Sequence, residues 1–288
     1  MSVLSVTVVI LCLSSCNGLP ECKINAYAVL ATNENTWCSA HVLAFSLLHS
    51  GTQSDIVIMY DWHLDNISRP LRRSVQVRYH KVAPSRARGH GPWESTYNKF
   101  WAGRLVQYCR VMLLDADMIV LHNIDNLFST VPTVHNSDVM FAAPIAYWIS
   151  PNVLCSCLIV MKPTETLFDD VLERFDGKYR EDMDYFNLRY GARTKRLDPV
   201  YAALIGEWYP RDRIYHHLQQ NVSVVHFIAE WKPFSFTDWP VGLDEFGVHV
   251  YARWWKYARA LSLHSHCSNW KSVHSAFLNF THTNHNEV

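Results

Sequence analysis

The sequence has no excess of charge of either sign and no apolar run long enough to cross a membrane. Its 288 residues carry 26 Lys and Arg against 26 Asp and Glu, so we expect neither nucleic acid nor an anionic membrane as a partner. The apolar run at residues 3–13 is too short for a membrane-spanning helix, so no transmembrane anchor is predicted in the mature chain. With 49% hydrophobic residues, the chain can bury one large core or two modest ones.

Residues 1–18 are typical of a signal peptide, because small residues follow the apolar run as they do near a signal-peptidase site. Basic residues before the run are missing, and a buried first strand is the alternative. Glycosylation sequons begin at Asn66, Asn221 and Asn279. Removing the leader leaves six cysteines, an even number that suggests disulfides. We expect the lumen of the secretory pathway (Golgi or ER) or secretion, and the cytoplasm if residues 1–18 are not a signal peptide.

Two carboxylates follow an apolar segment in the middle of the chain. Asp115 and Asp117 interrupt the run at residues 111–121, and residues i and i+2 of an extended chain point to the same face. Converging carboxylates repel each other and lose hydration, which is unfavourable unless a cation lies between them. A hard divalent ion bound also by phosphate oxygens meets that need. The alternative is an ordinary strand-to-turn pair, because the pattern recurs at Asp182 and Asp184.

Hydrophobic periodicity predicts alternating strands and helices. Strands are predicted at residues 26–31, 55–60, 75–82, 139–143, 158–161 and 222–228, and a further strand begins at residue 111. Helices are predicted after residue 35 and at 97–108, 166–175, 183–190 and 246–261. This order favours an α/β protein with a parallel sheet covered by helices on both faces. We predict one domain over residues 19–262 and a polar, histidine-rich, loosely held tail at 263–288.

Polar residues are expected together at one edge of this sheet. Thr32 and Asn33, the Asp115 and Asp117 pair, and His226 all lie at or near the carboxyl ends of predicted strands. Ligand-binding loops of open parallel sheets gather at those ends. The convergence favours a functional role for the aspartate pair.

Five motifs occur in a characteristic order and spacing. They are residues 30–33 (Leu-Ala-Thr-Asn), 96–99 (Thr-Tyr-Asn-Lys), 113–128, 197–201 (Leu-Asp-Pro-Val-Tyr) and 226–234. On these motifs the chain resembles the glycogenin-like, family 8 retaining glycosyltransferases, which have the GT-A fold. The resemblance extends over about residues 24–235.

The resemblance implies a single GT-A-type, Rossmann-like domain with a mixed, mostly parallel sheet flanked by helices. It also implies a metal-dependent retaining transferase. Such an enzyme would move a hexosyl group (glucose, galactose or glucuronic acid) from a UDP-sugar to an acceptor hydroxyl of a glycan, a polyol or a protein. A homodimer is compatible with this family. The alternative is a catalytically impaired relative that binds a sugar nucleotide or a glycan.

The resemblance also implies that Asp115, Asp117 and His226 ligate Mn²⁺ or Mg²⁺, which bridges the diphosphate of the UDP-sugar. Oxygen and imidazole ligands suit either ion, and the single nitrogen favours manganese. The alternative for His226 is a structural histidine. Lys99 and Lys232 match positions that contact the phosphates or the sugar nucleotide, and the alternative for each is a solvated surface charge.

Further positions match the donor-binding site by resemblance. Leu30, Thr32 and Asn33 match the uracil and ribose pocket, and Ala116 lies between the two carboxylates of the same site. The aromatic residue that would stack on the base is displaced. Thr36 aligns with it and Trp37 stands beside it.

Two segments depart from the family pattern. Asp182 aligns with the family aspartate near the sugar and Asp184 stands where glycine is usual, so both are candidate catalytic residues. The alternative is that they only begin a helix, where carboxylates are favoured. The family's Asn-Ser-Gly is replaced by Cys155, Ser156 and Cys157. Ser156 is carried over as a donor-binding residue, and for the cysteines packing is favoured over a disulfide or a reactive pair.

Overall fold

The computed structural model describes most of the chain between residues 24 and 270. The described residues are 24–61, 64, 65, 67, 69–85, 95–132, 138–173, 181–205, 217, 218, 220–228, 231–235, 244–263, 267 and 270. The predicted signal peptide and the tail from residue 271 lie outside them. No described helix is long and apolar enough to span a bilayer.

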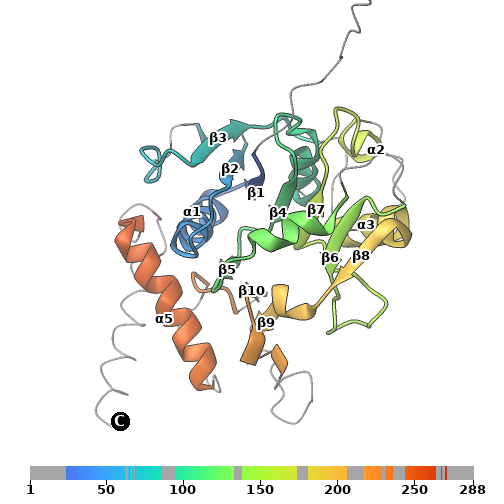
Figure 1. Cartoon of the computed structure of the whole chain (residues 1–288). Helices are drawn as coiled ribbons and strands as arrows, with labels where there is room; N and C mark the ends of the chain where they lie inside the picture. The colour runs from blue at the N-terminus through green and yellow to red at the C-terminus, as the bar shows by residue number, and fades with distance from the viewer. Residues whose placement is uncertain are drawn as a thin grey trace, which may run out of the picture.

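A seven-stranded sheet forms the centre of the protein (Figure 1). Its strands are β1 (Ala26–Ala31), β2 (Asp55–Tyr60), β3 (Val77–Lys81), β4 (Val111–Leu114), β6 (Phe141–Pro144), β7 (Leu158–Met161) and β8 (Thr194–Leu197). Their order across the sheet is β3-β2-β1-β4-β7-β6-β8. The first four are parallel, β7 is antiparallel to β4 and β6, and β8 is parallel to β6. The predicted mixed, mostly parallel sheet is confirmed.

Alternate side chains of β1 enter two different cores, as expected for a strand buried on both faces. Tyr27, Val29 and Ala31 belong to the core on one face, and Ala26 and Ala28 belong to the core on the other. Nearly every residue of β1 is apolar because both of its faces are covered.

Helices cover both faces of the sheet. The first core is closed by α1 (Glu34–His49) and α5 (Glu245–Ala260), which lie side by side in Figure 1. The second core is closed by the 3₁₀ helix η3 (Thr96–Arg104) and by α2 (Asp169–Leu172) and α3 (Asp182–Tyr190). Three further 3₁₀ helices among the described residues are η4 (Asp125–Thr130), η5 (Gly191–Arg193) and η6 (Pro199–Tyr201).

A second, three-stranded sheet begins where the first one ends. It contains β5 (Met118–Val120), β10 (Val224–Phe227) and β9 (Ala203–Ile205), with β10 antiparallel to β5 and parallel to β9. Residues 115–117 form the turn that joins β4 to β5. The prediction that Asp115 and Asp117 lie i and i+2 in an extended segment is therefore wrong. They lie in a turn between two sheets.

The first part of the predicted tail is attached to the domain rather than loosely held. Cys267 forms a disulfide with Cys38 of α1. Leu263, Cys267 and Trp270 are all buried, and the rings of Trp270 and Trp254 of α5 pack with centroids 4.8 Å apart. The expectation of a loose tail fails at these three residues because a disulfide and an aromatic cluster hold them.

The helix predicted at residues 97–108 is a shorter 3₁₀ helix. Gly103, near its end, lies so close to Phe168 that an added Cβ would come within 2.6 Å of the phenylalanine ring. This close approach lets η3 pack tightly under α2. It places Lys99, in the middle of η3, beneath the end of β4.

Candidate active site

The turn between β4 and β5 holds both aspartates at the junction of the two sheets. The Asp115 amide donates a hydrogen bond to the Cys157 carbonyl at 2.9 Å, and the Phe227 amide donates to the Asp117 carbonyl at 2.9 Å. One end of the turn is thus fixed to the large sheet and the other to the small sheet. The turn backbone is held independently of any ligand.

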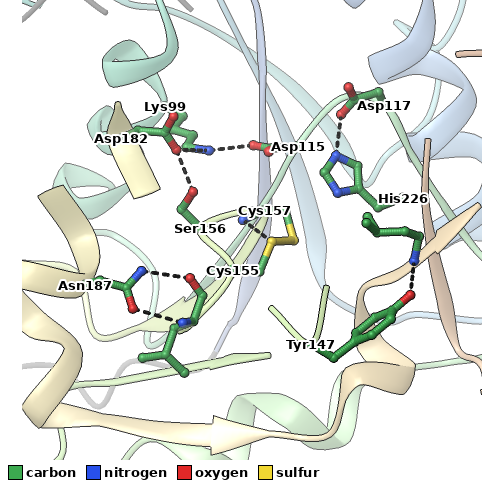
Figure 2. The surroundings of a disulfide bond; sticks show 12 residues. Lys99, Asp115, Asp117, Tyr147, Cys155, Ser156, Cys157, Asp182, Asn187 and His226 are labelled. Atoms are coloured by element: carbon green, nitrogen blue, oxygen red, sulfur yellow. Dashed lines mark hydrogen bonds and ion pairs between the residues drawn. A yellow bond between two sulfur atoms is a disulfide. The ribbon is translucent and has the colours of Figure 1, made fainter. Parts of the chain in front are cut away.

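Asp115, Asp117 and His226 come together at this junction. One potential ligand atom from each lies within 4.8 Å of the other two. His226 Nε2 is 3.3 Å from Asp117 Oδ1 (Figure 2). His226 Nδ1 is buried and has no hydrogen-bond partner among the described residues. The folded chain therefore assembles the predicted ligand set from distant parts of the sequence.

Lys99 lies beneath the turn and binds two carboxylates. Its Nζ is 2.9 Å from Asp115 Oδ1 and 2.6 Å from Asp182 Oδ2. Ser156 Oγ donates a hydrogen bond of 2.6 Å to the same Asp182 oxygen. The side chains of Lys99 and Asp182 are only 6% and 8% exposed. Lys99 is therefore not a solvated surface charge.

Burial and neighbouring charges set the protonation of this group. Burial would lower the pKa of Lys99, but Asp115 and Asp182 raise it above its ordinary value. Burial would raise the pKa of Asp182, but Lys99 and hydrogen bonds from two hydroxyls lower it. Burial raises the pKa of Asp115, with Lys99 opposing and Asp117 adding to the rise. Lys99 and Asp182 form a stable ion pair, whereas Asp115 lacks enough positive charge around it.

Asp117 pairs with the more exposed of the two lysines. Its Oδ2 is 2.9 Å from Nζ of Lys232, whose side chain is 32% exposed. Burial would raise the pKa of Asp117, but His226 and Lys232 lower it. Asp117 therefore stays ionised and can offer its oxygens to a cation.

The residues fit a divalent cation. Three carboxylates face two ammonium groups among the described residues of this junction, which leaves one negative charge. Carboxylate oxygens and an imidazole nitrogen are donors that Mn²⁺ and Mg²⁺ accept. The buried Nδ1 of His226 lacks a partner. Asp115, Asp117 and His226 would hold such an ion.

The end of β1 lies next to the aspartate turn. Val29 pairs with Leu114, so the residues that follow them, Leu30 and Asp115, emerge side by side. Asn33 caps α1, and its side chain accepts a hydrogen bond of 2.9 Å from the Thr36 amide. The end of β1 and the start of α1 therefore form a compact edge beside the carboxylates.

The region around Trp37 differs from the expected base-stacking surface. Trp37 is 1% exposed and packs edge-on against His41 and Tyr60 in the core. Thr36 Oγ1 accepts a hydrogen bond of 2.9 Å from the Thr32 amide. Neither side chain at the position of the displaced aromatic residue offers an open aromatic face.

Known proteins resemble this chain in sequence and in fold. No family model matches the chain. The UDP-glucuronate:xylan alpha-glucuronosyltransferase 2 of Arabidopsis thaliana is 26% identical over 257 residues, which cover 81% of this chain and 41% of the relative. Glycogenin-1 of Caenorhabditis elegans is 24% identical over 275 residues, which cover 89% of this chain and 56% of the relative. The chain thus spans about half the length, or less, of these relatives.

The chain is similar in sequence and fold to the glycogenin-like family 8 glycosyltransferases. The crystal structure of the galactosyltransferase LgtC, in complex with donor and acceptor sugar analogs, has the same fold. It superposes with a TM-score of 0.57 at 14% identity and covers 82% of this chain and 95% of LgtC. The fold predicted from the sequence is that of LgtC.

Asp182 and Asp184, the two candidate catalytic residues, lie on opposite sides of α3. Asp182 is buried in the cluster, whereas Asp184 is exposed. Residues two apart on an α-helix are separated by about 200° around its axis. One helix therefore cannot bring both aspartates to the same site, and the structure brings only Asp182. Ala116 is buried between the two turn aspartates.

The two cysteines that flank Ser156 form a disulfide rather than simply packing. Cys155 and Cys157 are joined to each other (Figure 2). Simple packing, which the sequence favoured, is therefore wrong. Ser156 lies between them and reaches Asp182. Cys109 is disulfide-bonded too, in agreement with the even cysteine count.

Thr96 was missed as a site residue. Its hydroxyl hydrogen-bonds the Asp182 carboxylate and helps to lower the pKa of that group. The signal was present, because Thr96 begins the same four-residue motif that ends in Lys99. The first and last residues of the motif, Thr96 and Lys99, both bind Asp182, which explains why they are three residues apart.

Proposed function

We propose that this family 8 glycosyltransferase is active and transfers a hexosyl group (glucose, galactose or glucuronic acid) from a UDP-sugar to an acceptor hydroxyl, with retention at the anomeric carbon. The meeting of Asp115, Asp117 and His226 within 4.8 Å is the observation that carries the proposal. Lys99 and Lys232 beside them supply positive charge. The Arabidopsis relative is named for a UDP-glucuronate donor, which supports a donor of this class.

The charged residues of the site have different roles in donor binding and in the reaction. A bound Mn²⁺ or Mg²⁺ would supply charge neutralisation of the diphosphate and so assist the departure of UDP. Lys232 is partly exposed, so its ammonium group can leave the ion pair with Asp117 and bind a phosphate oxygen instead. Lys99 stays in the buried group and orients Asp182. Leu30, Thr32 and Asn33 border the place for uracil and ribose, and Ala116 and Ser156 line the donor site.

Asp182 is the residue to which we assign charge stabilisation at the anomeric carbon. Its lowered pKa keeps it ionised, and an anion stabilises the oxocarbenium-like transition state of glycosyl transfer. Retention requires either a covalent glycosyl intermediate on a carboxylate or attack from the leaving-group face. Asp182 can serve either route, and exposed Asp184 can approach only an acceptor that covers α3.

The donor and the acceptor can be identified in one experiment. The purified protein is incubated with Mn²⁺ and separately with UDP-glucose, UDP-galactose and UDP-glucuronic acid, and mass spectrometry follows UDP release and self-modification. One donor should be hydrolysed or transferred faster than the others. Tight UDP binding with neither hydrolysis nor transfer, on any glycan, polyol or protein acceptor, would instead establish the binding-only alternative.

Asp117→Ala tests the metal assignment. Loss of a ligand should weaken Mn²⁺-dependent UDP binding at least about 100-fold, the upper end of the cost of losing an outer-shell partner. Isothermal titration calorimetry with Mn²⁺ or with EDTA measures this. Glu165→Ala, which removes an exposed carboxylate, is the matched control. Equal UDP affinity in Asp117→Ala and wild type would reject the assignment.

We further propose that the protein resides in the secretory-pathway lumen or is secreted. The disulfides Cys38–Cys267 and Cys155–Cys157 support an oxidising compartment. Asn221, in a sequon, is exposed and should carry a glycan. Enzymatic deglycosylation should increase the gel mobility of wild type more than that of Asn221→Gln. Identical shifts would show that this sequon is not used.

A further inference from the structure

The Cys155–Cys157 disulfide lies against the candidate metal ligands, and the proposed reaction does not use it. Figure 2 shows it between the Lys99 group and the pair formed by His226 and Asp117. Its two sulfurs and one ring nitrogen of His226 lie within 4.8 Å of one another. His226 Nδ1 is buried without a hydrogen-bond partner among the described residues. A metal-ligand set of a second kind is therefore present, with its sulfurs bonded to each other.

We propose that reduction of this disulfide creates a second metal site, in which the thiolates of Cys155 and Cys157 and the imidazole of His226 bind Zn²⁺ or a similar thiophilic divalent ion. Two thiolates and one imidazole are three of the four ligands of a tetrahedral zinc site. Bonds of about 2.3 Å to sulfur and about 2.0 Å to nitrogen separate such ligand atoms by about 3.5–4 Å. The spacing at this junction is compatible with that geometry, and water takes the fourth position.

The reduction step requires an external two-electron reductant, for which a cellular dithiol is sufficient. Two electrons and two protons convert the disulfide bond into two thiols, and the dithiol that supplies them is oxidised to a disulfide. Zinc binding then displaces the two thiol protons to solvent, because the thiolate is the ligand form. No bond of the protein backbone changes.

The backbone around the two cysteines is held on both sides, so the thiols stay in place after reduction. The Cys155 amide donates to the Pro144 carbonyl at 2.8 Å, and the Cys157 carbonyl accepts from the Asp115 amide at 2.9 Å. The Asn187 side chain binds both the amide and the carbonyl of the residue before Cys155, at 2.9 and 2.8 Å. Rotation of the cysteine side chains is sufficient to open the site.

The two metal sites exclude each other, because His226 belongs to both. Soft thiolates select zinc, whereas the carboxylates of Asp115 and Asp117 suit Mn²⁺ or Mg²⁺. While the disulfide is closed, His226 is left to the carboxylates. When it is open, zinc withdraws His226 from them. This exclusion rests on the proposed function, but the zinc site itself does not.

Zinc binding to the full-length protein tests the site directly. Wild type and Cys155→Ser/Cys157→Ser are reduced with a phosphine, and bound Zn²⁺ is measured by competition with a chromophoric chelator. The double variant keeps Cys38, Cys109 and Cys267, so it corrects for zinc taken up by the other thiols. Reduced wild type should bind about one Zn²⁺ per chain more than the reduced variant, and the oxidised proteins should not differ. Equal zinc binding by the two reduced proteins would overturn the proposal.

A second variant avoids reduction of the other disulfides. Cys155→Ser leaves Cys157 as a free thiol in unreduced protein, and thiol titration confirms it. Added Co²⁺ should give a thiolate-to-cobalt charge-transfer band in the near ultraviolet. His226→Ala in the same background should weaken cobalt binding at least about tenfold. A missing band, or a band that does not depend on His226, would overturn the assignment.

Two outcomes separate this inference from the proposed function. If oxidised wild type does not bind UDP with Mn²⁺ but reduced wild type binds the additional zinc, the proposed function fails and the zinc site stands. If oxidised wild type binds UDP but no additional zinc binds after reduction, the zinc site fails alone. Where both hold, one equivalent of Zn²⁺ should weaken Mn²⁺-dependent UDP binding at least about tenfold in reduced wild type.

Discussion

The two sides of the candidate active site use the same kinds of ion pair at different depths. On the buried side, Lys99 joins Asp115 and Asp182, and its side chain is 6% exposed. On the open side, Lys232 joins Asp117, and its side chain is 32% exposed. A buried pair is costly to break because a charge is left without water. A partly solvated pair can exchange one partner for a ligand, so depth separates the residues that support the site from those that bind.

The largest difference between the two sides should appear in the free energy of unfolding when each lysine is replaced by methionine. Lys99→Met leaves the buried Asp182 and the partly buried Asp115 without their cation and should lower the free energy of unfolding by about 3–5 kcal/mol. Lys232→Met removes a partly exposed pair and should lower it by about 0–1 kcal/mol. Urea unfolding followed by tryptophan fluorescence measures both. Equal losses in the two variants would show that depth does not distinguish them.

The next largest effect should appear in turnover. Asp182→Asn keeps the shape of the side chain but removes its charge, and kcat should fall by about 10²–10³, as for other lost electrostatic contacts to a transition state. The UDP dissociation constant should change little, because Asp182 is not among the metal ligands. Asp184→Asn, on the opposite side of α3, is the matched control and should change kcat less than about tenfold. A greater loss in Asp184→Asn would reverse the assignment.

A smaller effect on the free energy of unfolding comes from His41, which lies outside the candidate active site. It should lower stability in mild acid, so it must be distinguished from protonation of the site residues. His41 is buried in α1, with Nδ1 2.8 Å from the Trp37 carbonyl oxygen and Nε2 3.0 Å from the Tyr79 hydroxyl. Burial lowers the pKa of His41 to about 4 from 6.5. Between these values the unfolded chain binds a proton that the folded chain does not. Stability is therefore complete above about pH 6.5 and decreases by about 3 kcal/mol as pH falls to about 4.

His41→Asn should remove this pH dependence. Urea unfolding at pH 7.5, 5.5 and 4.5 should show a decrease in wild type and in the control His49→Asn, which changes an exposed residue. The decrease should be smaller in His41→Asn. The pKa of Asp182 is lowered, so Asp182 is protonated only at lower pH than His41. Identical profiles in His41→Asn and wild type would contradict the prediction.

The large sheet could be predicted from the sequence because its strands are locally recognisable. The predicted bounds of β1, β2 and β7 agree with the structure, since each is an apolar run between polar turns. Asp182 and Lys99 were also recognised, because family motifs surround them. Hydrophobic periodicity and motifs identify each segment as a strand or a helix. The alternation of strands and helices along the chain then predicts that the strands run parallel.

The junction of the sheets could not be predicted in the same way. Whether β5 continues β4 depends on its pairing with β10, far away in the chain, and no local pattern encodes that pairing. The burial of Trp37 and the exposure of Asp184 likewise depend on what packs against each helix. The Cys155–Cys157 bond depends on the local turn, because the same residues in an extended strand would point to one face without bonding.

The Cys38–Cys267 disulfide closes a covalent ring, since its cysteines are 229 residues apart. The ring persists when the protein unfolds. The unfolded chain is then less expanded, which in the chain-entropy model adds about 5 kcal/mol to stability. Refolding starts with the first helix already tethered to the residues that follow the last one. A single proteolytic cut within the ring leaves the two fragments linked until the bond is reduced.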